Sequence, residues 1–217
     1  MQKLFEDLEV RMIKKRKILE YLIKEYDPTS IIVYGSFAND TNDAHSDFDA
    51  LVICSKSHKM HDDNVIDNTE LDVFIYPTEY FVDEYDISEI LQIENGDLLL
   101  DKEGIGAKLL REVEAYVSNY DAKSISEKQM ELSWCKKMLK RIEREDIEGL
   151  YRWHWLLMDS LEIYFDIKNE MYLGPKKSLD LLLKYDKKGF EIYKEALEFK
   201  EVDSLKKWIN YLEKSLN

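Results

Sequence analysis

Two short apolar stretches flank a glycine–serine turn and a pair of alternating aspartates, and this arrangement constrains the fold more than any other feature. The first stretch, Ser30–Tyr34, leads into Gly35-Ser36, and the second begins at Asp47-Phe48-Asp49. Short apolar runs bounded by turn residues predict β-strands rather than helices. Alternate residues of a strand point to the same face, roughly 6–7 Å apart. Asp47 and Asp49 are therefore expected to face one shared site.

A divalent cation would make this pair of carboxylates stable. Two ionised carboxylates this close repel each other, and an opposite charge between them removes the cost. Mg²⁺ suits the position, because it takes one or two protein carboxylates and leaves its other ligand positions to water and substrate phosphates. A third acid, Asp72, lies in another predicted strand, Leu71–Tyr76. If that strand pairs beside the first, Asp72 joins Asp47 and Asp49, either as a metal ligand or as a general base.

The combined motif resembles a known signature. Gly35-Ser36, ten residues, then Asp47-Phe48-Asp49 and a later Leu71-Asp72-Val73 are similar to the pattern of the DNA polymerase beta-like nucleotidyltransferase superfamily. Within that superfamily the chain is most similar to the small bacterial nucleotidyltransferases that modify aminoglycoside or lincosamide antibiotics. The likeness covers about residues 30–76 and, more loosely, residues 98–104.

The resemblance implies a reaction and the residues that serve it. It implies that a nucleoside monophosphate, AMP from ATP or the equivalent part of another nucleoside triphosphate, moves to a hydroxyl group with two Mg²⁺ ions as cofactors and release of pyrophosphate. Asp47, Asp49 and Asp72 would be catalytic and hold the metal. The implied nucleotide-binding residues are Gly35, Ser36, Ser46 and Lys177. Glycine lets the backbone approach phosphate closely, and lysine meets phosphate as a point charge.

The general base is left open by the sequence. Besides Asp72, several acids follow the third strand and are alternatives for this role: Glu79, Asp83, Glu84, Asp86 and Glu89. A general base must lie within hydrogen-bond reach of the proton that it removes. The spacing of these acids along the chain does not choose among them.

Charge is unevenly distributed along the chain. Residues 1–120 contain 12 Lys and Arg against 26 Asp and Glu, whereas residues 121–217 contain 19 of each. The whole net charge of −14 therefore lies in the part with the motif. Such a surface repels the phosphates of long nucleic acids and attracts cations. The expected partners are a nucleoside triphosphate and a small-molecule acceptor such as an aminoglycoside-type antibiotic, although the acidity also serves solubility.

Two domains are predicted. Residues 1–120 are expected to form an α/β nucleotidyltransferase catalytic domain with a small mixed sheet, and residues 121–217 an all-α helical bundle that binds the acceptor. Apolar periodicity predicts helices at 3–26, 105–119, 124–145, 147–168, 176–185, 188–198 and 201–216. Residues 55–68 are expected to be an exposed excursion, and residues 79–95 to be helical.

Several other features favour plain structural interpretations. The rings of Tyr151–Trp155 are expected mainly in the core, with stacking on a ligand as the alternative. His154 is expected to pack, and His58 and His61, three residues apart, are not expected to bind zinc. No apolar run reaches the roughly 20 residues that span a bilayer. With no secretory segment at its start and two cysteines without metal-ligand spacing, the protein is expected in the cytoplasm, away from membranes.

Two further functions fit the same pattern. Nucleotidyltransferases of this superfamily also act as antitoxins that adenylylate a partner protein, which would change only the acceptor. A non-catalytic nucleotide-binding module is the other alternative. The complete set of three aspartates favours an enzyme over that module.

Overall fold

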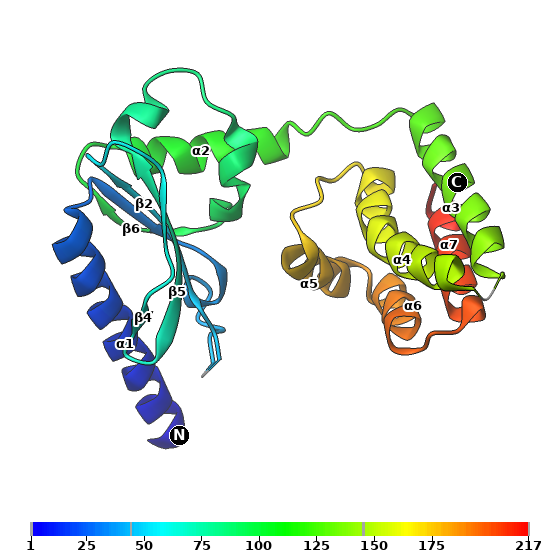
Figure 1. Cartoon of the computed structure of the whole chain (residues 1–217), viewed down its shortest axis with the longest axis horizontal. Helices are drawn as coiled ribbons and strands as arrows, with labels where there is room; N and C mark the ends of the chain where they lie inside the picture. Colours follow the sequence, from blue (N-terminus) through cyan, green and yellow to red (C-terminus); the bar gives the residue numbers. More distant parts are fainter. Residues whose placement is uncertain (1, 44, 145, 217) are drawn as a thin grey trace. The chain divides into compact units, whose positions relative to one another are not determined.

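The computed structural model describes residues 2–43, 45–144 and 146–216 and divides into two compact units, Met1–Ser118 and Asn119–Asn217. The first unit contains the β-sheet together with two α-helices, and the second contains α-helices, as Figure 1 shows. The predicted fold class, an α/β part followed by an all-α part, is confirmed. The functional assignment of the two parts stays a prediction.

The sheet of the first unit is mixed, with strand order β3-β5-β2-β1-β6. Its central pair, β2 and β5, is parallel, and the remaining pairs are antiparallel. The short strand β4 pairs with β5 outside this path. The strands span β1 Ser30–Val33, β2 Phe48–Cys54, β3 Met60–Asp62, β4 Val65–Ile66, β5 Thr69–Pro77 and β6 Asp97–Asp101.

Each face of the sheet has its own apolar cluster. On one face, Ile18 and Leu22 of α1 (Gln2–Tyr26) belong to the same buried cluster as Val52 of β2 and Val73 of β5. The other face is covered by the 3₁₀ segment η3 (Ile87–Ile93) and by α2 (Ile105–Ser118), which share a second cluster with alternate residues of β1 and β2. The alternation of side chains along each strand therefore supplies both layers.

Two expectations about this unit are wrong. The segment 55–68 is not an excursion, because it contains β3 and β4, which both pair with β5. The segment 79–95 is not one helix but contains the 3₁₀ turns η2 (Thr78–Phe81) and η3, and Ile90 inside η3 has non-helical angles of φ −124° and ψ 17°. Strands of two or three residues are too short to show a period, and 3₁₀ turns carry apolar residues at nearly helical spacing.

The described residues of the second unit form five helices, and the predicted positions are confirmed to within three residues. They are α3 Ile125–Ile142, α4 Ile147–Lys168, α5 Pro175–Tyr185, α6 Lys187–Glu198 and α7 Val202–Leu216. Side-chain caps start three of them: Ser124 forms a capping box with Glu127, and the carboxylates of Asp146 and Asp186 accept hydrogen bonds from the amides of Gly149 and Gly189. Such caps satisfy amide groups that the first helical turn leaves without partners.

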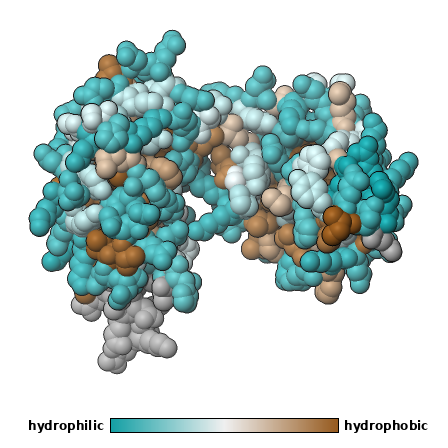
Figure 2. All heavy atoms as spheres, in the orientation of Figure 1, coloured by the Kyte–Doolittle hydropathy of each residue, from teal (hydrophilic) through white to brown (hydrophobic). Residues whose placement is uncertain are grey.

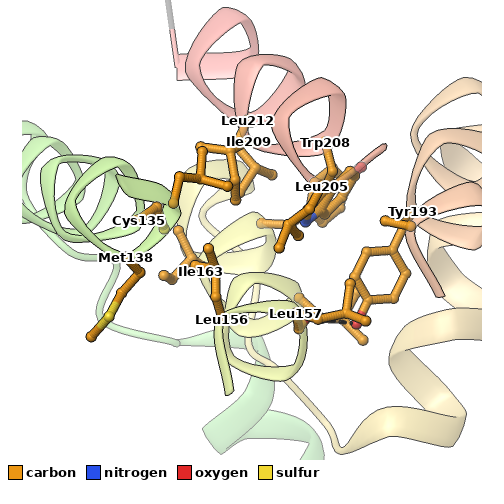
Figure 3. Packing of buried hydrophobic residues seen from close by; sticks show 14 of the residues in the cluster. Cys135, Met138, Leu156, Leu157, Ile163, Tyr193, Leu205, Trp208, Ile209 and Leu212 are labelled. Carbon is orange, nitrogen blue, oxygen red and sulfur yellow. Dashed lines mark hydrogen bonds between the residues drawn. The ribbon is translucent and has the colours of Figure 1, made fainter. Parts of the chain in front are cut away.

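The core of this unit joins all five of these helices, because Leu182 of α5 belongs to it as well. Figure 3 shows side chains from α3, α4, α6 and α7 pointing toward one another, with Trp208 of α7 fully buried among them. The Trp208 indole N–H donates to the Ser160 hydroxyl at 3.0 Å, and the Tyr193 hydroxyl donates to the Leu157 carbonyl at 2.9 Å. The polar ends of both rings are therefore satisfied, which removes the main cost of burying them.

The face of the molecule in Figure 2 is mostly hydrophilic, with apolar side chains in small separate groups. Among the described residues, no helix combines the length and the apolar character that crossing a bilayer requires.

Candidate functional site

Three carboxylates from two neighbouring strands meet at one point in the first unit. Asp49 of β2 and Asp72 of β5 are direct partners in the parallel register, and Asp47 lies one residue before β2. One potential ligand atom from each of the three lies within 4.8 Å of the others. The structure thus brings together the three acids that the sequence analysis grouped.

This spacing fits a divalent cation. Two oxygens on opposite sides of one Mg²⁺ lie about 4.2 Å apart, which is twice the Mg–O distance. Because adjacent oxygens of an octahedral ion lie closer, about 3 Å apart, side-chain rotations would draw the three carboxylates in around one ion or let them bridge two. Asp47 is exposed and the other two are partly buried, so the cluster remains open to a phosphate-bearing substrate. Carboxylate oxygens are also the ligands that Mg²⁺ prefers.

The Gly35–Ser36 turn packs directly against this cluster. Gly35 has φ +66°, and a Cβ atom built on it would lie 2.1 Å from Oδ2 of Asp49. Only glycine tolerates both the left-handed backbone and this close approach. The turn is a single 3₁₀ segment, Gly35–Phe37, so its contribution is proximity and not a helix dipole.

Ser36 carries an unsatisfied polar atom at this place. The residue is 5% exposed, and its Oγ has no hydrogen-bond partner among the described residues. Leaving such a group buried and unpaired costs about 1–3 kcal/mol, so it usually has a reason. A phosphate oxygen is a suitable acceptor for this hydroxyl. The orphaned Oγ and the closely packed glycine are the observations by which the turn fits a nucleotide phosphate.

Tyr34 is a residue of the site that the sequence analysis missed. It is buried, and its hydroxyl also has no partner among the residues that the structure describes. Burial, followed by the charges of Asp72 and Asp49, raises the pKa of Tyr34 far above its ordinary value. The hydroxyl is therefore protonated and available as a donor. The only sequence signal was its position directly before Gly35.

His61 is the second missed residue. It lies in β3, and its Nε2 is 2.6 Å from Oδ1 of Asp72. The imidazole also contacts the ring of Phe74, with 4.8 Å between the ring centroids. No local pattern could have placed it there, because the contact depends on the pairing of β3 with β5.

Comparison with known proteins identifies the unit that carries these residues. Residues 15–113 match the family described as nucleotidyltransferase domain. This segment, which carries the acid cluster, is similar to nucleotidyltransferase domains. The match confirms the prediction of an enzyme of the nucleotidyltransferase type, and it leaves the antibiotic-modifying subfamily as a prediction.

A nucleotidyltransferase-like protein from Exiguobacterium sibiricum 255-15 is similar with 12% sequence identity and a TM-score of 0.39, over 95% of this chain and 74% of that one. Among curated proteins, no match to the chain was found.

Ser46 occupies a structured position beside the three acids of the first unit. Its hydroxyl accepts from the Asp43 amide at 2.9 Å and lies 3.2 Å from the Asp43 carboxylate. These bonds shape the loop before β2 and leave its predicted contact with phosphate as a prediction. They are also the bonds expected of a serine in a turn.

The alternative general bases do not join the triad. Among the described residues, the acid cluster of the first unit consists of Asp47, Asp49 and Asp72. Glu89 instead pairs with Lys59 at 2.5 Å, and the Asp86 carboxylate accepts from the amide of Ser88. Asp72 is thus the general-base candidate that the geometry of this unit favours.

The second unit contains Lys177 and a set of exposed rings. Lys177 lies in the first turn of α5, and its predicted role toward phosphate stays a prediction. Within Tyr151–Trp155, Trp153 is buried, whereas Tyr151 and Trp155 are exposed, so the expectation of a core cluster holds for Trp153 alone. The expectation that His154 packs is wrong, because it is exposed.

A cavity of about 460 Å³ opens between α3 and α4 of this unit. Its walls include the indoles of Trp134 and Trp155, whose centroids are 5.5 Å apart in an edge-to-face arrangement. The ionisable residues around it comprise one lysine and four acids: Lys123, Glu131, Asp159, Glu162 and Asp166. Burial raises the pKa of Asp159 and that of Glu131. The cavity therefore combines aromatic walls with an excess of negative charge.

Proposed function

We propose that the protein transfers AMP from ATP, with Mg²⁺, to a hydroxyl of a small cationic acceptor and releases pyrophosphate. The observation that carries this proposal is the meeting of Asp47, Asp49 and Asp72 beside the Gly35 turn within a nucleotidyltransferase domain. Nucleotidyl transfer needs a cation held against the triphosphate and hydrogen-bond donors beside it. The clustered carboxylates would hold the cation, and the orphaned Ser36 hydroxyl is one such donor.

Each residue has a defined part in this proposal. Asp47, Asp49 and Asp72 would hold the metal, which stabilises the charge that develops on the phosphates and lowers the pKa of the attacking hydroxyl. Gly35 and Ser36 grip the triphosphate. As the acceptor oxygen bonds to the α-phosphorus, the bond from that phosphorus to the bridging β-phosphate oxygen breaks. Asp72 accepts the hydroxyl proton, and the electron pair of the broken bond leaves with pyrophosphate.

The cavity of the second unit supports a cationic acceptor. Ligand pockets commonly enclose 300–1,000 Å³, and indole faces attract ammonium groups. Oε2 of Glu131 is buried and has no hydrogen-bond partner among the described residues, although its other oxygen pairs with Lys123. A ligand amine would satisfy that atom. These features, with the acidic character of residues 1–120, favour an aminoglycoside-type antibiotic over an uncharged acceptor.

Pyrophosphate release in the presence of ATP, Mg²⁺ and a panel of cationic and neutral acceptors tests the proposal. We expect release that depends on a cationic acceptor and is lost in Asp47→Asn and Asp49→Asn. Asp63→Asn, which changes an exposed aspartate of the same unit outside the triad, is the matched control and should behave as the wild type. Full activity in either triad variant would remove these residues from the mechanism.

A second assay separates the acceptor classes. The protein is incubated with ATP labelled at the α-phosphate and with a cell lysate. Label in small molecules agrees with the proposal, whereas label in a single protein band would indicate an antitoxin-type enzyme. ATP binding without any transfer would indicate a non-catalytic module.

A further inference from the structure

His61 and Asp62 are neighbours in β3 with opposite surroundings. The Asp62 carboxylate is buried and accepts hydrogen bonds from the hydroxyls of Tyr21 and Tyr26, at 3.0 and 2.7 Å. It thereby ties β3 to α1. His61 points to the other face of the sheet, as alternation along a strand requires, and there it meets Asp72 of the acid cluster.

The contact between His61 and Asp72 follows from the strand register. His61 stands directly opposite Phe74 in the antiparallel pair, so Asp72, two residues before Phe74, is its diagonal neighbour on the same face. Phe74 supports the imidazole from the side. An ionised carboxylate only accepts hydrogen bonds, so Nε2 of His61 is the donor in the 2.6 Å contact.

This hydrogen bond has little to contribute to the fold. The side chains of His61 and Asp72 are 45% and 40% exposed. Pairs that are this open to water typically contribute only 0–1 kcal/mol. The attachment of β3 to the rest of the unit already rests on Asp62 and on the ladder with β5. The position of His61 is better explained by the site than by stability.

We propose that His61 is a positioning residue that holds the Asp72 carboxylate at the metal site; this inference rests on the proposed function. Repulsion from Asp47 and Asp49 pushes Asp72 away from the cluster when no cation is present. The Nε2–H bond opposes that displacement and selects one rotamer. A carboxylate has about four lone-pair positions, so Asp72 keeps acceptor capacity for a cation while it is held.

Metal affinity is the property that this role should change. Loss of a residue that orients a metal ligand typically weakens metal binding 10–100-fold. Mn²⁺ replaces Mg²⁺ as the probe, and free Mn²⁺ is counted by electron paramagnetic resonance in titrations without nucleotide. We expect His61→Ala to raise the Mn²⁺ Kd by 10–100-fold, and His61→Gln, which keeps a side-chain N–H, to recover most of the affinity.

Two controls make the test specific. His58→Ala removes an exposed histidine of the same segment, which contacts Ser57, and should bind Mn²⁺ as the wild type does. Thermal unfolding without metal should be unchanged in all three histidine variants, which a structural role for His61 would not allow. Wild-type Mn²⁺ affinity in His61→Ala, or no recovery in a folded His61→Gln, would overturn the inference.

Asp49→Asn separates failure of this inference from failure of the proposed function. If Asp49→Asn loses Mn²⁺ and His61→Ala does not, the site is a metal site and only the role of His61 is wrong. If neither variant changes Mn²⁺ binding, the metal site itself is wrong, and the proposed function fails with it. In the assay of pyrophosphate release, His61→Ala should also need 10–100-fold more Mg²⁺ for half-maximal rate.

Discussion

Aspartates in the two units are held in contrasting ways. In the second unit, Asp186 caps α6 by accepting from the Gly189 amide, and it also accepts from the hydroxyls of Tyr164 and Tyr211. In the first unit, Asp47, Asp49 and Asp72 are clustered with one another within 4.8 Å. Donors thus surround the Asp186 carboxylate, whereas the three others lie beside one another, with Nε2 of His61 donating to Asp72.

The difference separates carboxylates that hold the fold from carboxylates that are arranged for a ligand. Burial by itself raises the pKa of Asp186, but the bonds from Gly189, Tyr211 and Tyr164 outweigh it and leave the pKa below its ordinary value. That carboxylate stabilises the native state as an anion. A cluster of like charges destabilises it, and a fold keeps such a cluster where a cation completes it.

The largest effect should come from removing one charge of the cluster. Asp49→Asn is expected to lower the rate of nucleotidyl transfer by about 10³-fold, because the metal contributes several kcal/mol to the transition state and 1.36 kcal/mol is a factor of ten. The free energy of unfolding in metal-free buffer should stay equal or rise, since a repulsion is relieved. Rate measurements and urea unfolding of the same sample check both. A loss of stability would show that the Asp49 carboxylate holds the fold, as Asp186 does.

Asp186→Ala should lower the stability of the second unit, in contrast to Asp49→Asn. It removes a helix cap and leaves two tyrosine hydroxyls without their acceptor, so the free energy of unfolding of the second unit should fall by about 2–4 kcal/mol. Urea unfolding followed by tryptophan fluorescence measures it, since Trp208 stacks on Tyr211. Asp186→Asn, which still caps and accepts, is the matched control and should lose less.

Metal should stabilise only the first unit. At a Mg²⁺ concentration of 100 times its Kd, the free energy of unfolding of that unit should rise by about 2.7 kcal/mol. The combined variant Asp47→Asn, Asp49→Asn should show no rise. Differential scanning calorimetry with and without Mg²⁺ makes the comparison. An equal shift in the variant would mean that the ion binds elsewhere.

Acid should remove the contribution of the Asp186 carboxylate to the free energy of unfolding. Its folded pKa is lowered, so its stabilisation is fully present above the unfolded value of about 3.9 and is lost as the pH falls through the folded value. The wild type should therefore exceed Asp186→Asn by a constant margin, of about 1 kcal/mol, above pH 5. That margin should begin to fall as the pH drops below about 4 and should vanish once the pH lies below the lowered folded pKa of Asp186. Unfolding curves across this range test it, and a margin that persists in acid would show that the charge is not responsible.

The smallest effect is expected at Tyr34. Tyr34→Phe removes a buried hydroxyl that lacks a partner among the described residues, so the free energy of unfolding should change by less than about 0.5 kcal/mol or rise slightly. Tyr164→Phe, which removes a hydroxyl that donates to Asp186, should lower it by about 1 kcal/mol. Chemical unfolding of the pair tests the comparison. A larger loss at Tyr34 would show that its hydroxyl is satisfied in solution.

Much of this fold was accessible from the sequence because its elements are strongly patterned. The helices of the second unit carry apolar residues at helical spacing, and Ser124 and Asp146 mark the starts of two of them. Side chains alternate along a strand, so the sequence predicted that Asp49 and Asp72 lie on one face of the sheet if β2 and β5 pair. The parallel register that sets them side by side confirms that assumption.

The missed parts depend on contacts between distant segments. The strand β3 has three residues, so nothing local predicts its pairing with β5 or the meeting of His61 with Asp72. The same holds for Tyr34, which looks like an ordinary strand residue until its hydroxyl is placed near the acids. Tertiary context decides such positions, and local propensity does not.

The parallel pairing of β2 and β5 also bears on how the chain is made. The segment 55–68 must be synthesised and folded back before the two strands can meet, and contacts between distant segments form slowly. A nascent chain that ends before Thr69 has two of the three acids and no third. The acid cluster therefore forms only when the tertiary structure forms, and unfolded copies of the protein should not compete for the ion.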